Sequence, residues 1–249
     1  MTLSSSIIEQ FDAISLDEMD SVKLMNRTDT KFAFNSERLD EILSLCKNDY
    51  RVLAINGKRS ASYITLYFDT PDHSLYLAHH NGKPYRYKIR IRNYVESGLF
   101  YLEIKQKIKG RTVKSRIKLK GFEEELSDRS KEFIEKTIGK KLELRPALWN
   151  NFRRITLVHC VAKERVTIDT SLTFSLQNTS RETSELAIAE VKQENRNRNS
   201  GIIQILRKLG IRESGISKYC VGSALIKPQL KYNTFKEKIL FIDRLNKVA

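Results

Sequence analysis

The segment Tyr85–Arg92 constrains the fold more than any other stretch of the chain, because its charged and apolar residues alternate strictly. The cations are Arg86, Lys88, Arg90 and Arg92, and the residues between them are Tyr87, Ile89 and Ile91. Side chains of a β-strand point alternately to its two faces, so the four cations would form one row about 7 Å apart. Such a row is either a solvated edge, which charge protects from aggregation, or one wall of a polyanion site. Repetition of the pattern elsewhere decides between them.

Other segments repeat this alternation of polar and apolar residues. The in-phase polar sets are Arg27, Asp29 and Lys31; Tyr101, Glu103, Lys105 and Lys107; Lys114, Arg116, Lys118 and Lys120; Arg165, Thr167 and Asp169; and Glu190 and Lys192. In a sandwich, each charged face would simply be the wet side of a sheet. Six such segments together favour a sheet that closes into a barrel with a charged lumen. A charged interior is tolerated only if water and anions fill it.

The order of the expected elements is compatible with such a barrel. We expect consecutive strands over 83–95, 99–108 and 111–120, joined by turns at 96–98 and 109–110. We expect helices over 3–19, 36–46, 122–138, 200–209 and 216–224, and a short one over 146–151. The predicted fold class is therefore α+β, an antiparallel β-barrel with a polar, basic lumen and helices packed outside. A helical segment (1–23) precedes the barrel domain (24–226), and a basic amphipathic tail (227–249) follows it.

The charge of the chain indicates the kind of partner. A formal net charge of +15 and a pI near 9.7 indicate a phosphate-rich partner: nucleic acid, nucleotide, inorganic polyphosphate or an anionic membrane surface. Cys46, Cys160 and Cys220 lie far apart in the sequence, so we expect reduced, buried thiols. The start of the chain lacks signal-peptide features, and no segment has the roughly 20 apolar residues of a membrane span. These features predict a cytoplasmic protein, and the amphipathic tail leaves open a peripheral contact with the inner face of a membrane.

Three carboxylates lie among the cations on the predicted lumen face. They are Glu103, Asp169 and Glu190. Phosphoryl transfer needs oxygen ligands for Mg²⁺ or Mn²⁺, and these carboxylates could supply them. Alternatively, each carboxylate neutralises a neighbouring lysine or arginine, and the sequence leaves both readings open.

Seven short motifs occur in an order that resembles a known family. They are Asp29–Phe32, Tyr67–Thr70, Arg90–Tyr94, Glu103–Lys105, Arg165–Thr170, Glu190–Lys192 and Ser217–Tyr219. Together they resemble the VTC domain, the polyphosphate polymerase domain of the vacuolar transporter chaperone family, within the triphosphate tunnel metalloenzymes. The resemblance implies an antiparallel β-tunnel and transfer of the ATP γ-phosphate onto a growing polyphosphate chain. It also implies Mn²⁺ or Mg²⁺ as the cofactor, with ATP and inorganic polyphosphate as the partners.

The resemblance assigns roles to particular residues. It implies a catalytic set of Lys31, Arg90, Arg92, Lys105, Lys114, Arg154, Arg165 and Lys218. Of these, Arg90, Arg92, Lys105 and Arg165 would bind the triphosphate. Glu190 would bind the metal ion, with Glu103 and Asp169 as weaker candidates. Two departures stand out: Phe152 occupies the position of a family tyrosine, and Asp29 and Lys31 lie where related triphosphatases begin with ExExK. Within the segment Tyr85–Arg92, we expect Arg90 and Arg92 to contact phosphate, and Arg86 and Lys88 to lie nearer the mouth of the lumen.

Two other functions are compatible with the same residues. The site could use water as the acceptor, which would make the protein a tripolyphosphatase or a nucleoside triphosphatase. The protein could also bind polyphosphate or RNA without catalysis. Nucleic acid is disfavoured, because the aromatic residues do not form the exposed stacking runs that single-strand binders use. A membrane protein partner is compatible with the sequence but not indicated by it.

Overall fold

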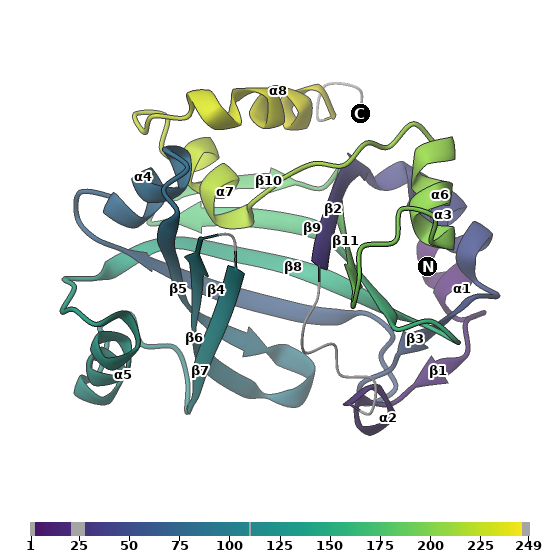
Figure 1. Cartoon of the computed structure of the whole chain (residues 1–249), viewed down its shortest axis with the longest axis horizontal. Helices are drawn as coiled ribbons and strands as arrows, with labels where there is room; N and C mark the ends of the chain where they lie inside the picture. Colours follow the sequence, from purple (N-terminus) through teal and green to yellow (C-terminus); the bar gives the residue numbers. More distant parts are fainter. Residues whose placement is uncertain (1–2, 21–27, 110, 246–249) are drawn as a thin grey trace.

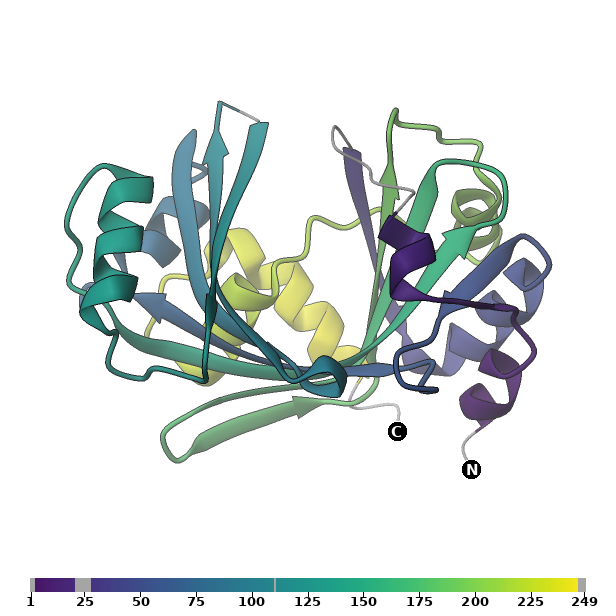
Figure 2. The ribbon, with the colours of Figure 1, turned by 90° about the horizontal axis from the view of Figure 1, so that it is seen from below.

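The structure, a computed structural model, describes residues 3–20, 28–109 and 111–245 and is built around one large β-sheet. The main strands follow the order β2-β11-β9-β8-β4-β5-β6-β7, and all neighbours along this path are antiparallel. Figure 2 shows that the sheet curls into a half-barrel with two arms. The edge strands β2 and β7 are not paired with each other within the described residues. The expected α+β class, with an antiparallel sheet curled around a lumen and helices outside, is confirmed, but the described residues form a half-barrel rather than a closed barrel.

The strands and helices are labelled in Figure 1. The strands are β1 (Ala13–Ile14), β2 (Thr28–Asn35), β3 (Tyr50–Leu53), β4 (Ala61–Asp69), β5 (Tyr85–Tyr94), β6 (Leu99–Ile108), β7 (Arg111–Leu119), β8 (Arg145–His159), β9 (Glu164–Leu176), β10 (Thr179–Thr183) and β11 (Leu186–Gln193). The α-helices are α1 (Leu3–Ile8), α2 (Leu16–Asp20), α3 (Leu39–Cys46), α4 (Ser74–His80), α5 (Asp128–Ile138), α6 (Gly201–Lys208), α7 (Lys218–Ile226) and α8 (Lys236–Leu245).

The alternation in the sequence divides each strand between an apolar outer face and a polar lumen. On β5, Ile89 and Ile91 are fully buried in a core cluster that includes Ile134 of α5. On β9, Val166 and Ile168 pack into a second cluster with residues of α3 and α6. The charged residues between them point to the opposite face. Helices thus cover the outside of both arms, and the charged side chains line the space between the arms.

Helix α7 occupies a different place from the other helices. It packs on β8 and β9 through Tyr219, Cys220 and Val221, in a cluster with Leu148 and Phe174. Because Leu148 and Phe174 reach α7 from the inner side of the sheet, α7 lies between the arms in Figure 2. Almost every residue of α7 is buried, which explains why its sequence has no polar face. This packing fixes the N-terminus of the helix at the lumen.

Several expected elements differ from the observed ones. The helix expected over 146–151 is wrong: these residues belong to β8, which pairs with β4 on one side and β9 on the other. Pairing on two sides supplies more hydrogen bonds than one helical turn begun at Pro146. The helix expected over 3–19 is divided into α1, β1 and α2, because β1 pairs in parallel with β3. The helix expected over 122–138 begins only at Asp128, where Ser127 caps it.

The smaller corrections concern β10, the cysteines and the tail. Strand β10 was not expected; it forms a hairpin with β9. Cys46 and Cys220 are buried thiols as expected, but Cys160 is exposed. The apolar face of the tail packs on the protein, since Ile242 of α8 is fully buried. No helix in the described part of the chain has the length and apolarity of a membrane span.

The close packing of α7 against the sheet gives a first prediction. A Cβ atom at Gly222 would lie 2.7 Å from Cε1 of Phe174 and 2.9 Å from Cδ2 of Leu148, both buried. We expect Gly222→Ala to lower the free energy of unfolding by about 1–3 kcal/mol, because a filled core resists an added methyl group. Urea denaturation measures this change. Gly121→Ala is the matched control, since its Cβ meets nothing within 4 Å; an equal loss there would contradict the explanation.

Candidate functional site

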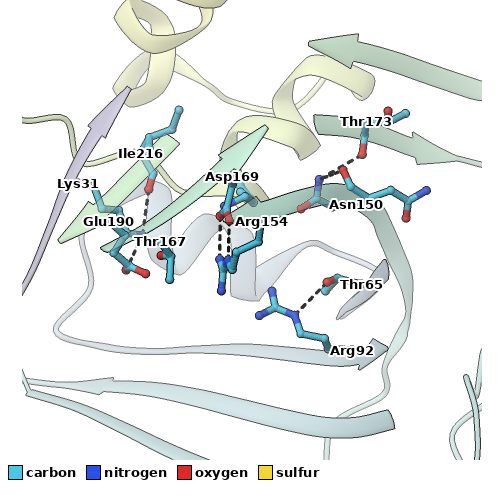
Figure 3. A network of polar contacts seen from close by, with 12 residues as sticks. Lys31, Thr65, Arg92, Asn150, Arg154, Thr167, Asp169, Thr173, Glu190 and Ile216 are labelled. Atoms are coloured by element: carbon cyan, nitrogen blue, oxygen red, sulfur yellow. Dashed lines mark hydrogen bonds and ion pairs between the residues drawn. The ribbon is translucent and has the colours of Figure 1, made fainter. Parts of the chain in front are cut away.

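The lumen collects cations from nearly every strand of the half-barrel and from α7. They are Lys31 of β2, Lys88, Arg90 and Arg92 of β5, Lys105 of β6, Lys114 of β7, Arg154 of β8, Arg165 of β9, Lys192 of β11 and Lys218 of α7. Three carboxylates, Glu103, Asp169 and Glu190, lie among them, each in contact with two cations. Figure 3 shows part of this network, with Arg154 directed at Asp169 and Lys31 beside Glu190.

Glu103 joins three strands of one arm. Its carboxylate accepts hydrogen bonds from Nη2 and Nε of Arg90 at 2.7 and 2.9 Å, and it pairs with Nζ of Lys114 at 2.5 Å. The hydroxyl of Tyr94 donates to the same carboxylate at 3.1 Å. Burial would raise the pKa of Glu103, but the charges of Arg90, Arg92 and Lys114 outweigh it and hold the pKa well below its usual range. Glu103 is therefore a permanent anion that offsets the repulsion between these cations.

Asp169 performs the same role where the other arm meets α7. Arg154 binds it in a two-point contact, Nε to Oδ1 at 2.5 Å and Nη2 to Oδ2 at 2.8 Å, and Lys218 pairs with Oδ2. Burial would raise the pKa of Asp169, but Arg154 and Lys218 lower it far below its usual range. Asp169 thus ties β8 and β9 to the N-terminus of α7.

Glu190 is the third carboxylate. It pairs with Lys192 on its own strand, and with Nζ of Lys31 at 3.7 Å across the β11–β2 pair. Nζ of Lys31 also donates to the carbonyl of Ile216 at 3.3 Å. Burial would raise the pKa of Glu190, but Lys192 and Lys31 hold it well below its usual range. Lys105 of the opposite arm also interacts electrostatically with Lys31 and Glu190. The two arms therefore share one electrostatic environment.

Arg92 differs from the other arginines of the network. Its side chain is only 6% exposed, yet it makes no ion pair within the described residues. Its Nε donates to Oγ1 of Thr65 at 3.2 Å, and its guanidinium lies 5.4 and 5.5 Å from the ring centres of Tyr63 and Phe152. Burial and the charge of Arg90 lower its pKa. A buried cation that forms no ion pair is costly, and an anionic ligand would reduce that cost.

Two stacked aromatic rings lie against several of the cations. Tyr63 and Phe152 stack with parallel rings, 5.1 Å between centres. Arg154 lies 5.0 Å from the ring centre of Tyr63, and Lys218 lies 4.7 Å from that of Phe152. The electron-rich faces attract cations without neutralising them, so these side chains are held in place and keep their charge for a ligand.

The N-terminus of α7 adds further donors to the site. Ser217 caps the helix by accepting a hydrogen bond from the amide of Cys220, and Nζ of Lys88 donates to the Ser217 hydroxyl at 2.8 Å. Lys88, which we expected near the mouth, thus contacts the residue that caps α7. Burial lowers the pKa of Lys88 to about 8. The positive end of the helix and the adjacent Lys218 both favour an anion here.

Lys105, Lys114 and Arg165 are more accessible than the other expected cations or lie farther from the network. Lys105 and Lys114 are exposed to the lumen solvent. Arg165 is half-buried, four residues along β9 from Asp169, with Nη1 3.8 Å from the sulfur of Met19. All eight expected cations thus lie on the lumen face, but Arg165 lies apart from the network around Asp169.

Three residues of the site were not in the expected set. Lys192 pairs with Glu190, Lys88 binds Ser217, and Tyr67 accepts a hydrogen bond from Nη1 of Arg90 at 3.3 Å. Burial would raise the pKa of Tyr67, but Arg90 and Arg92 lower it to about 8. The signal for Lys192 was present, since it follows Glu190 at the strand period. Tyr67 carries no such signal, because alternation does not separate a lumen tyrosine from a core one.

The carboxylates bear on a possible metal ion in two ways. The described residues contain no group of three or more His, Cys, Asp or Glu side chains suited to hold a metal ion. Mg²⁺, however, is often held by one or two carboxylates together with substrate phosphates. Glu190 and Asp29 fit this requirement: they lie on the lumen face of adjacent strands, in register with Lys31 and Lys192. These residues therefore fit an ion that arrives with a phosphate ligand.

The family comparison covers most of the chain. Residues 26–227 match the family model described as the VTC domain. No curated protein sequence matches the chain.

Several solved structures resemble the chain at low sequence identity. A putative adenylyl cyclase from Hippeastrum, described as having a dominant triphosphatase activity, is 16% identical, with a TM-score of 0.47; the match covers 80% of this chain and 96% of that one. A putative adenylate cyclase from Bacillus halodurans is 13% identical, with a TM-score of 0.47 and coverage of 78% and 96%. The protein PH1819 from Pyrococcus horikoshii is 14% identical, with a TM-score of 0.46 and coverage of 82% and 99%. Similarities this distant carry no information on function.

The low pKa of Glu103 predicts how acid destabilises the protein. A carboxylate with a depressed folded-state pKa stabilises the fold above its unfolded pKa of about 4.3, and this contribution is lost as the pH falls. We expect Glu103→Gln to lower the free energy of unfolding at neutral pH by about 3 kcal/mol, since it leaves Arg90 and Lys114 unpaired. The variant should also lose less further stability between about pH 5 and pH 3 than the parent does.

Urea denaturation at several pH values measures both effects. Glu132→Gln on the exposed face of α5 is the control and should change neither quantity. An unchanged acid dependence in Glu103→Gln would mean that Glu103 does not hold the cations together.

Proposed function

The chain belongs to the VTC domain family, and we propose that it is a polyphosphate polymerase, which transfers the γ-phosphate of ATP to a growing polyphosphate chain. The proposal rests on one observation above all: the lumen contains buried or closely packed cations in excess of its carboxylates. Arg92 has no carboxylate partner within the described residues, and Lys88 is bound only to a hydroxyl. A linear chain of phosphates matches this arrangement, because its charges are closely spaced and every unit offers oxygens to Arg and Lys.

The state of the carboxylates supports phosphate rather than water as the acceptor. A hydrolase gains from a general base whose pKa lies near the working pH. Glu103, Asp169 and Glu190 all have strongly lowered pKa values, and each is engaged by two cations. A terminal phosphate oxygen is already anionic and needs no base. The carboxylates of the lumen thus favour an acceptor that brings its own negative charge.

The proposed reaction needs position and charge rather than a protein nucleophile. An oxygen of the terminal phosphate of the chain attacks the γ-phosphorus of ATP, the bond from that phosphorus to the bridging oxygen breaks, and ADP leaves. Arg90, Arg92 and Lys218 would align the donor and acceptor phosphates and stabilise the charge that spreads over the transferred group. The rings of Tyr63 and Phe152 would hold the guanidinium groups of Arg92 and Arg154 in position for these phosphates.

A divalent ion, Mn²⁺ or Mg²⁺, would be held by Glu190 with Asp29. When bound, such an ion neutralises charge on the phosphate oxygens. Because Glu190 is paired with Lys192 and Lys31, these lysines would turn toward phosphate when the carboxylate takes the ion. As the donor is ATP, we place the reaction in the cytoplasm.

The alternative with water as the acceptor uses the same cations and differs in its products. With ATP and Mn²⁺, we expect the purified protein to form long polyphosphate, together with one ADP for each phosphate added. Gel electrophoresis of the polymer and chromatography of ADP measure both. Release of orthophosphate in proportion to ADP, without polymer, would show a hydrolase; binding of polyphosphate with no turnover of ATP would show a non-catalytic binder.

The unpaired state of Arg92 predicts a distinct kinetic effect. We expect Arg92→Gln to lower kcat at least about 100-fold, as loss of a donor to a transition-state charge does. Arg86→Gln is the matched control on the same face of β5; its side chain donates to the carbonyl of Lys83, and we expect it mainly to raise KM for ATP. Steady-state kinetics distinguish a loss of kcat from a rise in KM, and thermal unfolding checks that both variants are folded. Equal losses of kcat would mean that Arg92 has no special position.

A further inference from the structure

A second cationic site lies outside the lumen, on the other face of β2. A pocket of about 380 Å³ is lined by Arg196, Arg198, Arg207 and Arg212, with Thr30 and Phe32 among the residues at its β2 wall. Arg196 and Arg198 belong to the segment after β11, Arg207 to the last turn of α6, and Arg212 to the segment after α6. Figure 1 shows α6 beside the arm that contains β2 and β11. Three segments therefore bring four arginines to one cavity.

The charge of this pocket is poorly balanced. Among the described residues, the one carboxylate that lines it is that of Glu213, which pairs with Nη2 of Arg196 at 2.6 Å. Within the described part of the chain, Arg198, Arg207 and Arg212 form no ion pair. Arg207 by itself would be explained by the helix dipole, because basic side chains favour a helix C-terminus. The dipole does not explain why arginines from two further segments converge on the same cavity.

The ligand that suits this pocket is a polyphosphate rather than a nucleic acid. Guanidinium groups bind two oxygens of one phosphate at once, so several arginines around one cavity suit adjacent phosphates. Single-stranded nucleic acid would require exposed aromatic side chains for stacking. The only aromatic residue that lines the pocket, within the described residues, is Phe32, and it is buried in the core.

The position of the pocket relates it to the lumen. Strand β2 is the edge of the sheet, with Lys31 on its inner face and Thr30 and Phe32 on its outer face. One strand therefore separates the lumen cations from the arginines outside. The outer edge of β2 is covered near Lys31, where the amide of Ser214 donates to its carbonyl at 2.7 Å. A chain that leaves the lumen around this arm would meet the arginines next.

We propose that this pocket is a second binding site for inorganic polyphosphate, and that it holds the part of a long chain that extends beyond the lumen. The identity of the anion rests on the proposed function; the existence of an anion site rests on the arginines. A short polyphosphate would fill the lumen alone, whereas a long one would contact both sites. The pocket would then raise the affinity for long chains selectively and keep a growing chain attached between additions.

Direct binding without ATP tests the proposal. In Arg207→Glu/Arg212→Glu, we expect the Kd for long-chain polyphosphate to rise at least about tenfold, because two arginine contacts become repulsive. The Kd for tripolyphosphate should stay within about twofold, because three phosphates fit within the lumen. Lys136→Glu/Lys140→Glu is the control, since it reverses two exposed charges at the end of α5 on the other arm and changes the net charge equally. Isothermal titration calorimetry measures these Kd values for the parent protein and the two double variants.

Each outcome of this experiment supports or overturns the proposal. If both double variants lost the same affinity for long-chain polyphosphate, net charge alone would explain the effect and the proposal would be wrong. Unchanged binding of long chains to Arg207→Glu/Arg212→Glu would show that the pocket is not a binding site. If single-stranded RNA lost affinity while polyphosphate did not, the pocket would be a nucleic-acid site and the proposal would be wrong. Arg198→Glu, a single surface change, repeats the test if the double variant does not fold. Because no step uses ATP, failure of the polymerase assay leaves the binding result intact.

Discussion

The repulsion between like charges in one enclosed space is the constraint on which the structure depends. Three carboxylates offset it, and each joins cations from different elements: Glu103 joins β5, β6 and β7, Asp169 joins β8, β9 and α7, and Glu190 joins β11 and β2. Their contacts connect most of the half-barrel. Without these carboxylates, repulsion between the inward cations would act to push the arms apart, against the apolar packing of α7 on strands of both arms.

The three carboxylates do not pair with every cation of the lumen, and we expect a ligand to bind at the cations that they leave unpaired. Arg92 is buried and Lys88 is partly buried, neither has a carboxylate partner within the described residues, and aromatic rings or a hydroxyl give them only partial compensation. A fold stores such unfavourable charge only where surrounding packing enforces it. Here the packing of Tyr219 and Gly222 of α7 on the sheet enforces it, because it fixes Ser217 and Lys218 beside β5 and β9. An anionic ligand such as the proposed phosphate chain would offset these uncompensated charges.

The sequence predicted the lumen well because strand parity is a local property. Residues two apart share a face, so the alternation at Tyr85–Arg92 placed Arg90 and Arg92 without any knowledge of the tertiary structure. It could not place Lys88 against Ser217 or pair Glu103 with Lys114, because both contacts depend on register and curl between distant segments. The same limit explains the error at 146–151. The sequence could not indicate the arginine pocket for the same reason, because no common spacing of residues links the segments that form it.

Phe152 stands where the resemblance to the family implies a tyrosine, and its contacts show what the aromatic ring contributes to the site. Phe152 is buried, stacks on Tyr63, and lies near Arg92, Arg154 and Lys218. All of these contacts use the ring face, which phenylalanine and tyrosine share. In the proposed complex, a hydroxyl would add one hydrogen bond to a phosphate that several cations would already bind. The ring that positions the cations is therefore retained, and the lost hydroxyl is the smaller contribution, because charge-assisted contacts to phosphate exceed neutral ones in strength.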